Sequence, residues 1–166
     1  MPRHAREKSQ SNIYHVMLRG VNRQIIFEDD RDRQYFMTAM QRCKEVSRYR
    51  LHAFCLMPNH VHLLIEPAEE PLETVFKRIG VSYANYFNKR HERVGHLFQD
   101  RFRSENVETD EYYMTALRYI LQNPVKAGIV PIRGCIAGAA SSPMKKEKEP
   151  SPIRSLPWAS SDPGNN

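Results

Sequence analysis

The most constraining feature of this chain is a pair of apolar runs separated by only two turn-forming residues. The runs are LHAFCLM at residues 51–57 and HVHLLIEP at residues 60–67, with Pro58 and Asn59 between them. Proline and asparagine favour a tight turn, and two short apolar runs joined so closely favour a β-hairpin. Because both runs are largely apolar, we expect this hairpin to lie in the middle of a sheet.

The remaining segments predict further strands and helices around this hairpin. Residues 13–20 are typical of a strand, and residues 95–109 of a strand with a loop. Helical spacing of apolar residues, with acids or proline at the start, marks residues 29–49, 71–94 and 110–128. We expect the last helix to stop at Pro124. This mixture predicts an α+β fold in which helices pack on an antiparallel central sheet.

The composition indicates one domain and a polyanionic partner. The 166 residues carry a net charge of +6, which favours contact with nucleic acid. Residues 134–166 are dominated by proline, serine, glycine and charge, and they contain too few apolar groups to offset their ordering entropy. We therefore expect a domain at residues 11–133 and a disordered tail at residues 134–166.

The cysteines and the apolar runs indicate in which compartment of the cell to expect this protein. Cys43, Cys55 and Cys135 are odd in number and far apart, which argues against a disulfide framework or a zinc knuckle. No apolar run approaches the roughly 20 residues of a membrane helix, and the run after the basic start is too short for a signal peptide. We expect a cytoplasmic, DNA-associated protein without membrane contact.

Two histidines at the start of the second apolar run are candidate metal ligands. In a strand, residues i and i+2 point to the same side, so His60 and His62 emerge side by side. Neutral imidazoles held in this way can share one divalent cation. Two histidines with ordinary hydrogen bonds on a half-buried strand explain the same spacing, and a metal ion also needs a third ligand.

The last predicted helix offers such partners. Tyr119 lies beside its apolar face, Asn123 lies one turn further on, and Tyr112 lies two turns back on the same side. An amide oxygen from Asn123 can complete a metal site, and a tyrosine phenol can act as a nucleophile. The alternatives are a half-buried amphipathic tyrosine and an asparagine that caps a helix before a proline.

Four motifs in order resemble the single-tyrosine HUH transposases, in particular the REP-associated (IS200-like) tyrosine transposases. They are YHVMLRGVNRQIIF, LMPNHVHLLIEP, GHLFQDRFRS and RYILQNPVKAGIV, and the resemblance spans Ile13 to Val130. It implies a ferredoxin-like HUH nuclease fold. His60 and His62 match the two histidines of the HUH motif, Tyr119 matches the catalytic tyrosine, and Asn123 matches the third metal ligand.

The resemblance also implies an activity. It implies cleavage and transfer of hairpin-forming single-stranded DNA through a 5′-phosphotyrosine, by a monomer or a homodimer. The implied cofactor is Mg²⁺ or Mn²⁺, which suits a site without thiolates. Tyr112 is the runner-up nucleophile because Ala116, four residues after it, cannot bind a metal ion.

Residues 77–103 form a basic segment that suits single-stranded DNA. The seven cations are Lys77, Arg78, Lys89, Arg90, Arg93, Arg101 and Arg103, against two acids. The interleaved aromatic residues are Tyr83, Tyr86, Phe87, Phe98 and Phe102. Cations contact phosphates and aromatic rings stack on bases in such interfaces, although core packing and a solvated helix face explain parts of the pattern equally well. By resemblance, Arg19 and Arg23 of the RGVNR loop, with Asn22 between them, are further candidates.

Three functions remain open at this point: a strand transferase, a protein that binds DNA hairpins without cutting them, and an unrelated hydrolase with a metal-bound water. The intact set of His60, His62, Tyr119 and Asn123 favours the transferase, since pure binding needs none of them. From Ile132 onwards the chain departs from the family pattern, and only LPWASS at residues 156–161 is similar to it. The target sequence is not fixed by any of these motifs.

Overall fold

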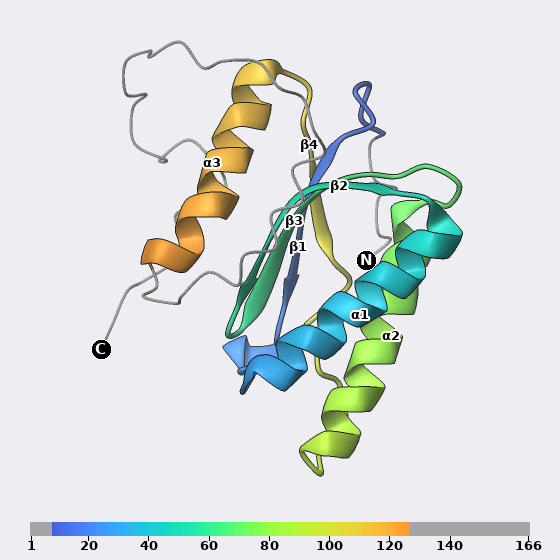
Figure 1. Cartoon of the computed structure of the whole chain (residues 1–166), viewed down its shortest axis with the longest axis vertical. Coiled ribbons are helices and arrows are strands. Elements are labelled where there is room, and N and C mark those ends of the chain that lie inside the picture. Colours follow the sequence, from blue (N-terminus) through green and yellow to red (C-terminus); the bar gives the residue numbers. More distant parts are fainter. Residues whose placement is uncertain (1–7, 127–166) are drawn as a thin grey trace, which may run out of the picture.

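The computed structural model describes residues 8–126 (Figure 1). The elements are β1 (Tyr14–Arg19), the 3-10 turn η1 (Val21–Arg23), α1 (Asp30–Ser47), β2 (Arg50–Met57), β3 (His60–Glu66), α2 (Leu72–Arg90), β4 (Arg103–Asn106) and α3 (Asp110–Lys126). The predicted domain end at residue 133 and the predicted tail lie outside the described residues. Within the described part, no helix is both long and apolar enough to cross a bilayer.

The four strands form one antiparallel sheet in the order β2-β3-β1-β4. The chain order β1-α1-β2-β3-α2-β4 with this strand order is the ferredoxin-like arrangement, in which each helix connects two strands on either side of a third. The predicted α+β fold with an antiparallel central sheet is therefore confirmed.

The predicted hairpin is confirmed, but its place in the sheet was wrong in part. β2 and β3 pair directly across a turn at Pro58 and Asn59. β3 lies in the interior, whereas β2 is an edge strand. The crossover through α1 returns β2 parallel to β1 with room for one strand between them, and β3 fills that position. The hairpin thus supplies one inner and one outer strand.

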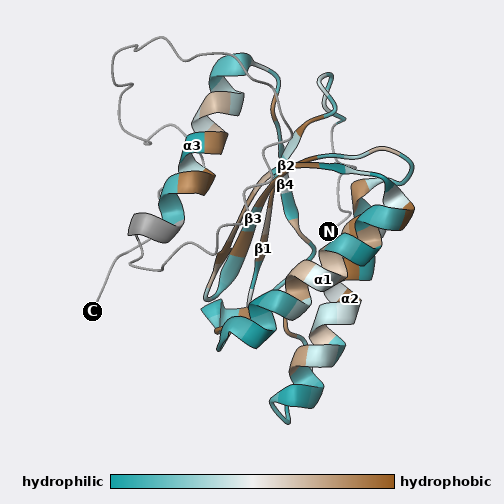
Figure 2. Ribbon diagram, in the orientation of Figure 1, coloured by the Kyte–Doolittle hydropathy of each residue, from teal (hydrophilic) through white to brown (hydrophobic). Residues whose placement is uncertain are grey.

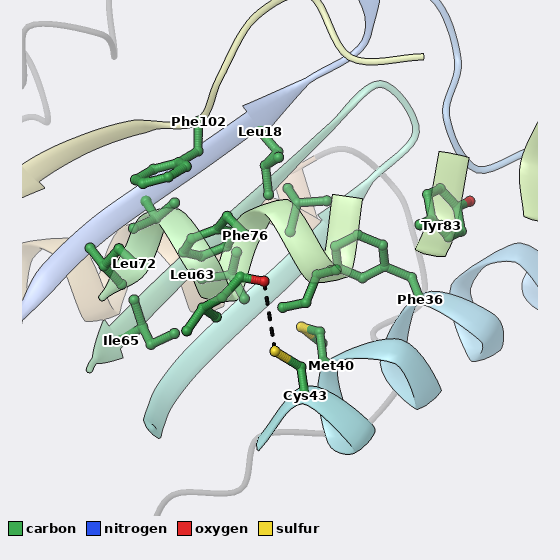
Figure 3. Packing of buried hydrophobic residues seen from close by; sticks show 14 of the residues in the cluster. Leu18, Phe36, Met40, Cys43, Leu63, Ile65, Leu72, Phe76, Tyr83 and Phe102 are labelled. Carbon is green, nitrogen blue, oxygen red and sulfur yellow. Dashed lines mark hydrogen bonds between the residues drawn. The ribbon is translucent and has the colours of Figure 1, made fainter. Parts of the chain in front are cut away.

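One face of the sheet is covered by α1 and α2 (Figure 1). Alternate residues of the two inner strands point to this face, and they are apolar and buried: Val16, Leu18, Val61, Leu63 and Ile65. Figure 3 shows Leu63 and Ile65 interleaved with Phe36 and Met40 from α1 and with Leu72 and Phe76 from α2. Burial of these large side chains is the main source of the domain's stability.

The other face is covered by α3 alone (Figure 1). Its apolar contacts form a smaller cluster, whose buried members are Ala53, Cys55, Leu64, Val107, Ala116 and Ile120. Figure 2 shows that α3 is apolar on one side and hydrophilic on the other, as a helix lying on a sheet must be.

The helix ends differ from the sequence-based boundaries where local backbone chemistry intervenes. α1 begins after Asp29, whose carboxylate caps the helix, and it ends at Ser47, followed by Arg48 in the left-handed conformation. α2 ends at Arg90, before the residues up to 94 that were predicted helical. α3 does not stop at Pro124 but runs to Lys126. Proline has no N–H to donate and its ring crowds the carbonyl four residues earlier, and only two residues of α3 follow Pro124 before the helix ends.

Candidate functional site

The two histidines of the β3 strand lie side by side on the face that α3 covers. His60 and His62 alternate with Val61 and Leu63, which point into the core on the opposite face. Their ring centroids are 4.8 Å apart and the rings are perpendicular. His62 is buried, with 1% of its surface exposed, whereas His60 is half-buried at the turn. The structure therefore brings the two imidazoles together as the strand alternation predicted.

Tyr119 of α3 contacts His62 of this pair. Its ring centroid is 5.3 Å from that of His62, with an interplanar angle of 83°. The tyrosine is half-buried, so its phenol is not sealed within the core. Tyr112, on the same helix, instead donates its hydroxyl to Glu105 on β4 at 2.5 Å. Of the two candidate nucleophiles, Tyr119 is the one in ring contact with a histidine of the β3 pair.

A third histidine, His15, completes a buried cluster. It lies on β1 with 3% of its surface exposed, and it faces α3 because its neighbours Tyr14 and Val16 face the core. Its Nε2 atom lies 3.2 Å from Nδ1 of His62, and its ring centroid lies 6.5 Å from that of Tyr119. His15 thus contacts both a candidate ligand and the candidate nucleophile.

Burial keeps the two inner imidazoles neutral. Desolvation lowers the pKa of His15 to about 4. The pKa of His62 is also held well below its ordinary value, first by desolvation and then by the neighbouring His60 and His15. A neutral imidazole has a lone pair on one ring nitrogen, which is the form that binds a metal ion or accepts a proton.

The turn that precedes His60 is held by the segment after β1. The carbonyl oxygen of Asn59 accepts a hydrogen bond from the Gly20 amide at 2.9 Å, and that of Pro58 accepts one from the Ile26 amide at 2.7 Å. A side chain at Gly20 would collide with the carbonyl oxygen of Gln24. The RGVNR loop therefore packs against the hairpin turn and lies at the same end of the sheet as His60.

Asn123 fits the role of a third ligand by its chemistry. It lies one helical turn beyond Tyr119, and its Nδ2 atom is buried with no hydrogen-bond partner among the described residues. Rotation of the amide exchanges its nitrogen and oxygen, so the same position can present an acceptor oxygen. Within residues 8–126, no three His, Cys, Asp or Glu side chains are placed to share one ion. The amide of Asn123 is a candidate ligand of another kind.

Two of the predicted DNA-contacting arginines lie on the same face of the sheet as the histidines. Arg19 is the cross-strand neighbour of His60, and both point to the α3 face. Two residues before Arg19 on β1, Met17 is the cross-strand neighbour of His62 on β3 and of Arg103 on β4. Arg103 is exposed, and Arg19 is half-buried with an Nε atom that has no hydrogen-bond partner in the described region. The part of the α3 face that carries Arg19 and Arg103 is the strongest candidate for phosphate contact.

The other predicted cations are not cross-strand neighbours of the histidine pair. Lys77 and Lys89 are exposed on α2, Arg101 is exposed just before β4, and Arg23 is exposed in the RGVNR loop. Arg78 is paired with Glu70, with nitrogen–oxygen distances of 2.6 and 2.9 Å. Lys77, Arg78 and Lys89 belong to α2, which covers the opposite face of the sheet (Figure 1), whereas the carbonyl oxygen of Arg23 accepts a hydrogen bond from Asn59 beside His60.

Arg90 and Arg93 are engaged in contacts that stabilise the fold. Arg90 binds Asp29 at 2.5 and 2.7 Å and the fully buried Asp32 at 2.5 Å. Arg93 donates to Gln24 at 2.5 Å and lies over the Phe87 ring. Loss of Arg90 would leave the buried carboxylate of Asp32 without its guanidinium partner.

The interleaved aromatic residues divide between core and surface. Tyr83, Phe87 and Phe102 are buried in the core and cannot stack on bases. Tyr86 and Phe98 are half-buried, and Tyr86 stacks on Tyr35 at a centroid distance of 3.7 Å. For this part of the pattern, core packing was the correct interpretation.

Sequence reasoning missed three side chains on the α3 face. His15 and Glu105 are cross-strand neighbours, and strand alternation in YHVML could have placed His15 opposite the apolar core. His52 sits at a bulge in β2 and contacts the Tyr113 hydroxyl at 3.0 Å. No pattern in the sequence predicts a bulge at this position.

Comparisons with known proteins agree with this geometry. The sequence profile of the family described as "Transposase IS200 like" matches residues 8–123. A REP-associated tyrosine transposase of Haemophilus influenzae is 30% identical over an alignment of 108 residues, and the match covers 58% of this chain and 61% of that protein. The match therefore spans less than two thirds of the relative's length.

A solved structure has the same fold. The structure of a REP-associated tyrosine transposase bound to a REP hairpin matches with a TM-score of 0.63 at 19% identity, over 78% of this chain and 76% of that one. The fold is accordingly that of the REP-associated tyrosine transposases. The profile covers well over half of the chain, and the protein belongs to the IS200-like transposase family. The resemblance inferred from the four motifs is confirmed.

Proposed function

We propose that this protein is a metal-dependent endonuclease and strand transferase for hairpin-forming single-stranded DNA, with Tyr119 as its nucleophile. The observation that carries this proposal is the contact of Tyr119 with His62, at a centroid distance of 5.3 Å, on the face that also holds His60. Membership of a transposase family supports the reaction class. The solved relative bound to a REP hairpin supports a DNA hairpin as the partner.

The residues suit a phosphoryl transfer in which one bond to phosphorus forms while another breaks. The Tyr119 oxygen forms a bond to phosphorus while the bond from phosphorus to the 3′ oxygen breaks. The phenolic proton is released and the departing 3′ oxygen takes up a proton, which leaves a 3′-hydroxyl and a 5′-phosphotyrosine. A phenol has a pKa near 10, so its oxyanion leaves more readily than an alkoxide, and the second displacement can rejoin strands.

The cofactor in this proposal is Mg²⁺ or Mn²⁺, held by His60, His62 and Asn123. Bound there, the ion would polarise the scissile phosphate and offset its developing charge. Arg19 on β1 and Arg103 on β4 lie on the same side of the histidine strand and would contact phosphates there. The two arginines therefore orient the strand, and Tyr119 supplies the attacking atom.

The test is formation of a covalent protein–DNA adduct. The full chain is incubated with a labelled single strand that carries a hairpin, in the presence of Mn²⁺, and is run on a denaturing gel. Wild type should give a retarded band, and Tyr119→Phe should give none while still binding the DNA. Tyr112→Phe is the matched control, because it removes a phenol from the same helix that bonds Glu105. It should retain the band.

The alternatives predict other patterns. An adduct from Tyr119→Phe but not from Tyr112→Phe would contradict the nucleophile assignment. Tight hairpin binding without an adduct in wild type would identify a binding protein. Cleavage by Tyr119→Phe at the wild-type rate would identify a hydrolase that uses water.

A further inference from the structure

Asn22 and Arg23 have a backbone conformation that residues other than glycine rarely adopt. Asn22 has φ 51° and ψ 33°, and Arg23 has φ 58°, so two consecutive residues of the RGVNR loop lie in the left-handed region. In that region the Cβ atom crowds a carbonyl oxygen, and asparagine tolerates this better than arginine does. The strain therefore falls mainly on Arg23.

The end of an α-helix does not explain this conformation. Elsewhere in residues 8–126, a positive φ at a non-glycine residue occurs only at single positions. Two of these, Arg48 and Glu92, follow α1 and α2, where a left-handed residue is a common way to end a helix. Asn22 and Arg23 lie instead within η1, before α1 begins.

Hydrogen bonds from two distant segments hold the strained backbone. The Val21 amide donates to the carbonyl oxygen of Leu97 at 3.0 Å, and the Gln24 side chain donates to the same oxygen at 2.9 Å. On the other side, the carbonyl oxygen of Arg23 accepts from Nδ2 of Asn59 at 3.4 Å. The loop is therefore held in one conformation by the rest of the fold.

This backbone presents two side chains that the described fold does not use. Asn22 and Arg23 are exposed, and neither side chain forms a hydrogen bond or an ion pair with any residue of the range 8–126. Arg78 and Arg90, in contrast, are ion-paired with carboxylates. Glycine would form the same turn without strain. A strained position whose side chain stabilises nothing in the fold points to a contact outside the chain.

The loop lies beside the candidate site. Asn59 donates to Arg23 through Nδ2, and its Oδ1 atom lies 2.5 Å from Nδ1 of His60. One side chain thus connects the loop to a candidate metal ligand. A DNA strand with its scissile phosphate at His60 and Tyr119 would carry its neighbouring nucleotides past Arg23.

The chemistry of the two side chains suits base edges. A phosphate contact needs only positive charge, which a relaxed backbone could carry equally well. A base edge requires donors and acceptors in fixed directions. A guanidinium matches O6 and N7 of guanine with two hydrogen bonds, and a carboxamide matches N6 and N7 of adenine. A fixed backbone sets the direction in which both side chains leave it.

We infer that Arg23 and Asn22 read unpaired purines next to the scissile phosphate, and that the RGVNR loop thereby selects which DNA sequence is cut. Arg23 would read guanine and Asn22 adenine. This inference rests on the proposed function, which supplies the DNA strand and the scissile phosphate. A two-bond contact of this kind discriminates against the wrong base by about 5- to 150-fold.

The first test selects among DNA sequences. The full chain is mixed in EDTA with a DNA hairpin whose unpaired flanks are randomised, and bound and free DNA are sequenced. Wild type should enrich guanine and adenine at nearby flank positions by about 5- to 150-fold. Arg23→Lys keeps the charge without the planar fork and should lose the guanine preference. Asn22→Gly keeps the left-handed turn and should lose the adenine preference.

The second test separates base reading from charge and from folding. Arg48→Gly is the matched control, because Arg48 is also exposed with φ 55° but follows α1, and it should keep both preferences. In urea unfolding, the midpoints of Arg23→Gly and Arg48→Gly should not fall below that of wild type, since glycine relieves the strain. A loss that is equal for all sequences in Arg23→Gly and is restored in Arg23→Lys would identify a phosphate contact and overturn the inference.

The outcomes also separate this inference from the proposed function. If wild type has no base preference, or if both loop variants keep it, the inference fails even where Tyr119 forms the adduct. If the preferences are lost in the two loop variants alone, the inference stands even where no adduct forms, and the proposed reaction fails by itself. A lowered unfolding midpoint for Arg23→Gly would show that the arginine serves the fold, which would contradict its role in reading DNA.

Discussion

The two faces of the sheet differ in what they bury. The face under α1 and α2 holds large apolar side chains, among them Phe36, Phe76 and Phe87. The face under α3 holds a small apolar cluster beside three histidines and a tyrosine. Because every strand alternates between the faces, one set of strands supplies both a stable core and a polar site. Stability and chemistry can therefore be changed separately, which the following substitutions test in order of decreasing effect.

The largest effect should come from the core face. Phe36 is fully buried between α1 and the sheet, so Phe36→Ala should lower the free energy of unfolding by about 3–5 kcal/mol. Val46→Ala is the control on the same helix, because Val46 is 58% exposed, and it should cost less than about 0.5 kcal/mol. Urea unfolding measures both. Equal costs would mean that α1 does not bury its apolar side as described.

On the other face, loss of a histidine should cost activity rather than stability. His60→Ala should reduce metal-dependent cleavage by roughly 100-fold, equivalent to about 2.7 kcal/mol of transition-state stabilisation. Its unfolding free energy should change by less than about 1 kcal/mol, because the ring is half-buried at a turn. His96→Ala, at an exposed histidine, should leave cleavage unchanged. A folding loss that matches the activity loss would remove the distinction between the faces.

The buried histidines should make stability depend on pH. His15 has a folded-state pKa of about 4, below the ordinary 6.5, so the unfolded chain binds its proton first. The stability from this neutral ring is complete above pH 6.5 and is lost as the pH falls toward 4, by about 2 kcal/mol at pH 5.

Urea unfolding at pH 7.5, 6 and 5 measures this dependence, with His15→Phe as the comparison. The variant should lose less stability than wild type over the same range, because it has no ring to protonate at this position. Parallel curves for the two proteins would mean that His15 is not buried in its neutral form.

Removal of one tyrosine hydroxyl from each face compares their contributions to stability directly. Tyr83 is fully buried in the core and donates to the carbonyl oxygen of Ile26 at 2.5 Å, so Tyr83→Phe should cost about 1–3 kcal/mol by leaving that oxygen unsatisfied. Tyr113 is half-buried against His52, and Tyr113→Phe should cost about 1 kcal/mol or less. Thermal or urea unfolding measures both losses of stability. A larger loss for Tyr113→Phe would contradict the assignment of the larger core to the face under α1 and α2.

The smallest effect should be on salt dependence. Arg103→Gln, beside the histidines, should reduce the slope of log affinity for hairpin DNA against log salt by about one unit. Arg42→Gln removes an exposed cation from α1 on the far side and should leave the slope unchanged. Filter-binding titrations at four salt concentrations suffice. If both slopes are unchanged, the strand follows another path, and Arg23 and Lys89 are the next positions to test.

The sequence by itself determined the kind and order of the main helices and strands, though not their exact ends, and the pairing of His60 with His62. Alternation along a strand fixes which residues share a face, and helical spacing fixes that Tyr119 and Asn123 share a side. These are local rules, so they needed no knowledge of the rest of the chain. Four short motifs in order also determined the family.

Only the tertiary structure decided which cations and which further histidine join the site. The register of β1 with β3 and β4 brings Arg19 and Arg103 to the histidine pair. In the same fold, Arg90 forms ion pairs with Asp29 and Asp32. His15 meets His62 although 47 residues separate them along the chain. Pairing between distant strands depends on the packing of the whole sheet, and charge along the sequence does not encode it.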